Sequence, residues 1–114
     1  MPDRRKLRRR HLIYYLRVFD RANHKLVGHL MDITTEGMML LSEQPIETGR
    51  TLQFRMLLPA EIHSSAQIAF DAFGLWCKKD INPDFYATGF EFREITLKDV
   101  EVIEKLIDDF GFRE

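Results

Sequence analysis

The chain has 114 residues, of which 45% are hydrophobic and 31% charged, with one cysteine and a formal net charge of −1. This size and composition are typical of one globular domain, and the sequence contains no apolar run of about 18 residues that would span a membrane. Six of the 17 Lys and Arg residues lie within residues 1–11, so the rest of the chain is acidic, which argues against a uniformly basic surface for DNA or RNA.

The basic N-terminal segment contains Arg4, Arg5, Lys6, Arg8, Arg9 and Arg10. A guanidinium group can bind a phosphate through two parallel hydrogen bonds and can stack on a purine, whereas a lysine ammonium is a point charge. Five arginines therefore favour shaped recognition of an anion. A solvated tail is the alternative, because chain ends often fray.

The residues after this segment favour a cytoplasmic protein. Only five apolar or aromatic residues, Leu12 to Leu16, stand between the basic segment and Arg17, which is too short for the core of a signal peptide. The single Cys77 cannot form an intrachain disulfide, which fits a reducing compartment.

Period-two alternation predicts strands along most of the chain. In residues 12–20, Leu12, Tyr14, Leu16 and Val18 share one face. Similar apolar segments, separated by turn-forming residues, follow at 25–33, 38–41, 51–58, 66–78 and 85–92. Gly28 in the second strand and a change of phase near Ala72–Gly74 in the fifth indicate bulges or close backbone approach.

The apolar spacing becomes helical near the C-terminus. Thr96 is a suitable N-cap, and Gly111 is suited to end the helix. The predicted core-facing stripe consists of Leu97, Val100, Ile103, Leu106, Ile107 and Phe110. Six short strands and one amphipathic helix predict an all-β core, a small antiparallel barrel or sandwich, with the helix packed against it.

A second chemical signal is the segment Asp32-Ile-Thr34-Thr-Glu-Gly37, which connects the second and third predicted strands. An Asp carboxylate can accept hydrogen bonds from a guanine edge, a Thr hydroxyl can donate to a phosphate, and Gly permits positive φ or close approach. The alternative is an ordinary turn, in which these side chains satisfy backbone groups.

Together, Arg4-Arg5-Lys-Leu-Arg-Arg9 and Asp32-Ile-Thr-Thr-Glu-Gly37 resemble the PilZ domain family of bacterial cyclic di-GMP receptors. Its signature is an Arg-x-x-x-Arg motif and a later Asp/Asn-x-Ser-x-x-Gly. Leu75-Trp76 and the segment Tyr86–Phe92 are similar to the family's closing strands. The resemblance covers about residues 4–110.

The resemblance implies a six-stranded antiparallel β-barrel of split-barrel type. A flexible arm over residues 1–11 would precede a barrel over 12–114, with the helix at about 96–110. The arm would fold over the barrel when the ligand arrives.

The resemblance also implies roles for individual residues. Arg5 and Arg9 would clamp phosphates and stack on guanine, with Arg4 beside them. Asp32 would bind a guanine edge, Thr34 a phosphate or base, and Gly37 would keep the turn open. The secondary candidates are Arg8, Arg10, Trp76 and Gly89.

The sequence departs from the family pattern in two respects. Thr34 stands where the family has Ser, which keeps the hydroxyl but adds a methyl group. The arginine motif also has two registers, because Arg4/Arg8 and Arg5/Arg9 both fit; the preceding doublet favours Arg5 and Arg9.

The resulting prediction is a cyclic di-GMP receptor that acts on an unidentified protein effector to regulate motility, biofilm or polysaccharide output. It would be a monomer or weak homodimer, with no cofactor, metal, DNA or RNA. The four His and Cys77 form no metal-binding spacing, and no nucleophile elbow or P-loop occurs, so no enzyme is expected. The alternatives are a PilZ-like interaction module that binds no nucleotide and, with less support, a single-stranded nucleic-acid binder.

Overall fold

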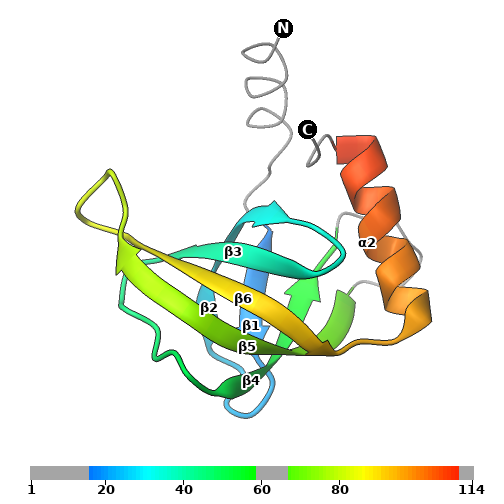
Figure 1. The fold of residues 1–114 in the computed structure, drawn as a ribbon, viewed down its shortest axis with the longest axis horizontal. Helices are drawn as coiled ribbons and strands as arrows, with labels where there is room; N and C mark the ends of the chain where they lie inside the picture. The colour runs from blue at the N-terminus through cyan, green and yellow to red at the C-terminus, as the bar shows by residue number, and fades with distance from the viewer. Residues whose placement is uncertain (1–15, 59–66, 111–114) are drawn as a thin grey trace, which may run out of the picture.

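Alternation of apolar and polar residues gives six antiparallel strands, followed by one helix (Figure 1). The structure is a computed structural model that describes residues 16–58 and 67–110. The strands are β1 (Arg17–Asp20), β2 (Leu26–Ile33), β3 (Gly37–Ser42), β4 (Thr51–Leu57), β5 (Gln67–Lys79) and β6 (Tyr86–Glu94). These bounds confirm the last five predicted strands to within two residues. The described part of the first begins at Leu16.

The sheet closes on itself in the order β1-β2-β3-β6-β5-β4, with β4 pairing back onto β1. This is the closed six-stranded antiparallel barrel that the resemblance implied. The closing contact is short, because β1 pairs with β4 only through Val18↔Met56, Phe19↔Arg55 and Asp20↔Phe54. A closed barrel removes the exposed sheet edges that would invite aggregation of so short a chain.

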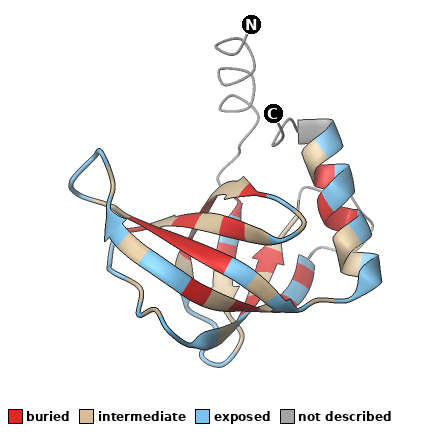
Figure 2. Ribbon diagram, viewed as in Figure 1, coloured by how far each residue is buried: buried red, intermediate tan, exposed pale blue. Residues whose placement is uncertain are grey.

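The inward-facing residues of all six strands form one core (Figure 2). Phe54 lies at its centre, with ring centroids 6.0 Å from Phe70 and 5.1 Å from Phe90, the latter edge-to-face. Leu16 and Val18 are buried, as the alternation of the first strand predicts. Leu12 and Tyr14, from the same predicted face, lie outside the described residues.

The two predicted irregularities are present. The register of β1 and β2 shifts between Val18 and Phe19, opposite Gly28 and Leu26. The pairing of β5 with β6 shifts twice, between Asp71 and Ala72 and between Gly74 and Trp76. Each shift redirects the side chains that follow it, and the second one orients Trp76.

The helix α2 (Leu97–Phe110) packs against the barrel core through Val102, Ile103 and Leu106. Thr96 is its N-cap, because its Oγ1 accepts a hydrogen bond of 3.1 Å from the Asp99 N–H. The helix therefore covers the barrel as expected. The described residues contain no helix long and apolar enough to cross a membrane.

The predicted apolar stripe is wrong at Leu97, whose exposure is 82%. At 100° per residue, Leu97 lies about 120° around the helix from Ile103. The buried side of α2 is centred near Leu106, with Val102 and Ile103 on either side of it, and Val102 was absent from the predicted stripe. The Phe110 side chain and Gly111 lie outside the described part.

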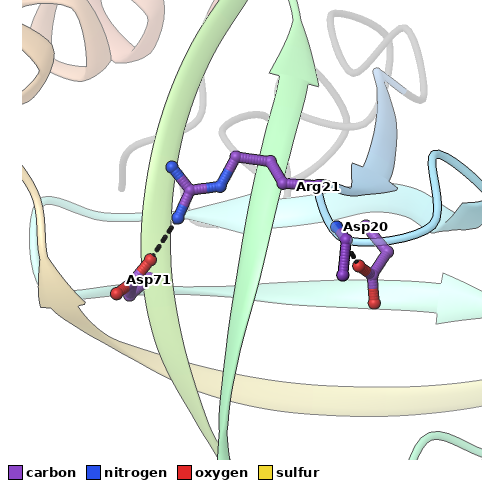
Figure 3. Close-up of polar contacts among 4 residues, drawn as sticks. Asp20, Arg21 and Asp71 are labelled. Carbon is purple, nitrogen blue, oxygen red and sulfur yellow. Dashed lines mark hydrogen bonds and ion pairs between the residues drawn. The ribbon is translucent and has the colours of Figure 1, made fainter.

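The β1–β2 turn is fastened to β4, the neighbour of β1 in the barrel, and to β5 beyond it (Figure 3). The Asp20 carboxylate accepts a 2.6 Å bond from the Ala22 N–H. The Arg21 N–H donates to the Gln53 carbonyl on β4, and its guanidinium reaches across β4 to form an ion pair with Asp71 on β5. These contacts lie at the end of β1 remote from Leu16.

Candidate functional site

The connection between β2 and β3 is a tight turn built by Thr34. Its N–H donates to the Gly37 carbonyl at 2.9 Å, and its Oγ1 accepts from the N–H groups of Glu36 and Gly37 at 3.1 and 3.2 Å. The hydroxyl thus satisfies backbone groups, as the ordinary-turn interpretation expects. A hydroxyl has one donor hydrogen in addition to its two acceptor sites, so these bonds do not use its donor capacity.

Asp32 lies near the end of β2, half-buried, immediately before this turn. Its Oδ1 accepts a 2.9 Å hydrogen bond from the N–H of Ile33. Such a bond occupies one of about four lone-pair sites of a carboxylate. Asp32 is therefore oriented by its own backbone at the rim of the turn.

Gly37 is required for close approach between strands. A Cβ at this position would lie 2.2 Å from the Phe90 carbonyl oxygen on β6. Gly37 pairs with Glu91, and the Phe92 N–H donates to the Glu36 carbonyl at 2.9 Å. The glycine thus lets β6 hold the turn directly, and the reason is contact between backbones and not a positive φ.

Trp76 and Gly89 form a similar pair on β5 and β6. A Cβ on Gly89 would lie 2.6 Å from both Nε1 and Cε2 of Trp76, so the indole rests on the glycine backbone. The Lys78 ammonium lies over the ring at 5.3 Å from its centroid, and 39% of Trp76 is exposed. Gly89 is therefore a close-approach position, and Trp76 is part of the barrel rim.

Strand register brings these residues into one row. Asp32 pairs with Met39, Met39 with Gly89, and Gly89 with Trp76, across four neighbouring strands. Adjacent strands lie about 4.8 Å apart, so the row spans roughly 14 Å.

The row and the turn line a cavity of about 330 Å³ that contains five of the predicted site residues: Asp32, Thr34, Gly37, Trp76 and Gly89. This volume is near the lower end of the range for ligand pockets, about 300–1,000 Å³. The lining residues that sequence reasoning missed include Glu36, Met39, Leu75 and Glu91. Glu36 lies inside the Asp32–Gly37 segment, whereas Met39 and Glu91 reach the cavity through the pairing of β3 with β6, which no local motif contains.

A larger cavity of about 570 Å³ lies at the opposite ends of β2 and β3, lined by residues including Leu26, Val27, Leu41 and Phe85. None of the predicted site residues contributes to it. Its lining also includes Gly28, Ser42 and Glu43, so a glycine, a hydroxyl and a carboxylate occur there too, and the two cavities are distinguished by where the predicted site residues lie. We therefore assign the candidate site to the smaller cavity.

The cavity wall is acidic. Asp32, Glu36 and Glu91 line it, and none of the described lining residues is Lys or Arg. Two described cations contact residues of this wall: Lys78 lies over Trp76, and the Nη2 of Arg93 lies 3.2 Å from Oε1 of Glu91. This wall suits a ligand's N–H donors, and a bound phosphate would need cations from elsewhere.

The predicted source of those cations lies outside the described residues: Arg4, Arg5 and Arg9, with Arg8 and Arg10 as secondary candidates. The structure does describe where that segment joins the barrel. The Leu30 N–H donates to the Leu16 carbonyl at 2.8 Å, and Arg17 pairs with His29. Because β1 and β2 are antiparallel, the chain meets the barrel beside Leu30, two residues before Asp32.

A metal site was not expected, and within residues 16–58 and 67–110 no group of three or more His, Cys, Asp or Glu side chains is placed to hold a metal ion.

Comparison with protein families shows that residues 3–109 match the PilZ domain. No match was found among curated proteins. One similar solved structure is the Bacillus subtilis inhibitor of motility (MotI/DgrA), at 18% identity and a TM-score of 0.67 over 87% of this chain. Another is K. pneumonia MrkH in its apo state, at 19% identity and a TM-score of 0.64 over 83% of this chain. This chain spans about half of the length of each relative, 49% of MotI/DgrA and 45% of MrkH. At such identity these two structures support the fold alone.

Proposed function

The chain belongs to the PilZ domain family, and from this premise we propose that it is a receptor for cyclic di-GMP. The observation that carries the proposal is the cavity in which Asp32, Thr34 and Gly37 lie together. Further support comes from the hydrogen bond between Leu30 and Leu16, which joins the start of the described chain to the barrel two residues before Asp32.

The ligand chemistry matches the distribution of charge. Guanine presents N–H donors, which suit the acidic wall, whereas the two phosphates of cyclic di-GMP need cations. Arg5 and Arg9 supply these cations, with Arg4 beside them and Arg8 and Arg10 as further contacts. Asp32 binds a guanine edge, and the Thr34 hydroxyl donates to a phosphate while its oxygen keeps the turn closed.

Ligand binding then changes the surface of the protein. An arm over residues 1–11 folds onto the barrel, and its loss of conformational entropy is offset by charge-assisted hydrogen bonds. A protein effector that controls motility, biofilm or polysaccharide output binds the newly formed surface. The receptor works in the cytoplasm as a monomer or weak homodimer and performs no catalytic step.

Titration calorimetry with cyclic di-GMP tests the proposal. Arg5→Ala and Arg9→Ala each remove a charged hydrogen-bond donor worth about 1.5–3 kcal/mol, so affinity should fall roughly 10- to 100-fold. Lys6→Ala is the matched control within the same arm and should change affinity less than twofold. Trp76, the single tryptophan, provides a fluorescence readout of the same titration. A wild-type protein that binds no cyclic di-GMP at tens of micromolar would disprove the proposal.

The two roles of Thr34 are separated by two substitutions in the same assay. Thr34→Ser keeps the hydroxyl and should bind at least as well as wild type. Thr34→Val keeps the shape but removes the acceptor of two backbone N–H groups, so both ligand affinity and the turn should be weakened. Equal affinities of the two variants would argue against any contribution of the hydroxyl.

One observation favours a second candidate function, a PilZ-like module that docks onto proteins without nucleotide. The cavity wall carries three carboxylates, and a ligand phosphate would be repelled by them if the arm did not reach the site. This candidate predicts that an Arg5→Ala/Arg9→Ala protein retains its partner and that cyclic di-GMP leaves partner binding unchanged. Nucleotide-dependent partner binding would rule it out.

A further inference from the structure

Glu91 has a position in the cavity that the family motifs do not account for. Phe90 is buried in the core, so its neighbours Gly89 and Glu91 face outward from β6. Glu91 lines the cavity and pairs across the sheet with Gly37. It thus lies two residues further along β6 than Gly89, which belongs to the row with Met39 and Trp76.

The Glu91 carboxylate is held by a neighbour that is itself fixed. Arg93 is two residues further along β6, on the same face, with its Nη2 3.2 Å from Oε1 of Glu91. The Arg93 guanidinium lies over the ring of Phe73 on β5, 4.6 Å from the centroid. Exposed ion pairs add little to stability, and this one places the Oε1 of Glu91 beside Arg93 while the residue lines the cavity.

Glu91 and Asp32 are too far apart to bind one base edge together. They lie two strands apart and two residues out of line, which gives a backbone separation of about 12 Å for strands 4.8 Å apart and a rise of 3.4 Å per residue. Between them the cavity is lined by Gly37, by Met39 and by Gly89, which the Trp76 indole covers. Two carboxylates about 12 Å apart, with a flat indole beside the space between them, suit a ligand with two planar bases.

We propose that Glu91 is a specificity residue that binds the second guanine of the ligand, while Asp32 binds the first. This inference rests on the proposed function. The guanine N1–H and N2 amino group form two adjacent donors, which match the two oxygens of a carboxylate. Adenine presents an unprotonated N1 at the same place and is repelled, so Glu91 selects guanine against adenine.

Glu91→Gln tests this assignment, with Glu94→Gln as the matched control, because Glu94 is an exposed glutamate of β6 that does not line the cavity. Calorimetry would compare cyclic di-GMP, cyclic di-IMP, whose bases lack the 2-amino group, and cyclic di-AMP. In Glu91→Gln the affinity for cyclic di-GMP should fall by about 5- to 100-fold, and its preference over the other two ligands should shrink by a similar factor. Glu94→Gln should match wild type within about twofold.

The sign of the effect separates this role from simple repulsion of phosphate. If Glu91 only repels the ligand, its neutralisation tightens all three ligands equally, and the inference is overturned. It is also overturned if Glu91→Gln keeps both the affinity and the preference of wild type. A wild-type protein that binds no cyclic di-GMP overturns the proposed function and this inference with it, whereas the first two results leave the proposed function standing.

Discussion

Gly37 and Gly89 shape the site through the absence of a side chain. Gly37 allows the β2–β3 turn to touch the backbone of β6, and Gly89 allows the Trp76 indole to lie flat on the sheet. One contact is with a carbonyl oxygen and the other with a side chain, and they therefore respond differently to an added methyl group. The carbonyl of Phe90 belongs to the barrel ladder and has little freedom to move, whereas the indole can rotate.

Gly37→Ala is therefore expected to destabilise the protein by about 1–3 kcal/mol, the usual cost of overpacking, because its Cβ would overlap the Phe90 carbonyl. Ligand affinity should fall as well, since the turn carries Thr34. Chemical denaturation and calorimetry measure the two effects.

Gly49→Ala is the control for this experiment. Gly49 has a φ of 81° and no atom within 4 Å of a built Cβ, so the substitution costs only backbone strain of about 1–2 kcal/mol. It should leave ligand affinity unchanged. Equal losses of affinity in both variants would show that general destabilisation, and not the turn, is responsible.

The sequence was sufficient to find the residues of the turn and insufficient to find Glu91. Asp32, Thr34 and Gly37 lie within six residues, so their pattern is visible without knowledge of the fold. Glu91 reaches the cavity only because β6 pairs with β3 in one register, and a shift of one residue would turn it to the other face. From sequence alone it looks like any exposed glutamate on a strand.

At the scale of elements, apolar periodicity predicted the five fully described strands and the helix, but not the orientation of the helix. Strands alternate strictly, so the bulges of β5 near Ala72–Gly74 appear as a change of phase, whereas the irregularity near Gly28 is indicated by the glycine itself. In α2, Leu97 and Val102 both fit an apolar face, and only packing on the barrel decides between them. The result is a buried Val102 and an exposed Leu97.

Substitutions in α2 should reflect this orientation. Ile103→Ala removes a fully buried side chain and should cost about 2–5 kcal/mol, whereas Leu97→Ala should change the free energy of unfolding by less than about 0.5 kcal/mol. Thr96→Ala removes the N-cap acceptor and should cost about 1 kcal/mol. Urea denaturation orders the three variants, and a large loss for Leu97→Ala would contradict the packing described here.

At the scale of the whole molecule, charge is divided between the two parts that would form the site. Residues 1–11 have six basic side chains and one acidic, and the remainder of the chain is acidic although the net charge is only −1. Residues 1–11 precede β1 in the chain, a strand of four residues that also closes the barrel. Ligand binding by residues 1–11 should therefore be transmitted to β1.

Hydrogen exchange provides the test. The Leu30 N–H, bonded to the Leu16 carbonyl, should exchange at least about fivefold more slowly when cyclic di-GMP is bound, because an ordered arm restricts local opening of β1. The Phe70 N–H on β5, which is part of the ladder with β4, serves as the internal control and should be unaffected. Equal protection at both positions would indicate global stabilisation without any particular effect on β1.

The hydrogen bond between Leu16 and Leu30 anchors the chain to the barrel, and this anchor limits how far away Arg9 can be. Arg9 is seven residues before Leu16, so its Cα lies within about 25 Å of that anchor even in a fully extended chain. A short tether of this kind gives an effective concentration in the millimolar range. Under the proposed function, the covalent link would keep Arg9 near the nucleotide, so that individually weak arginine contacts would suffice to hold it.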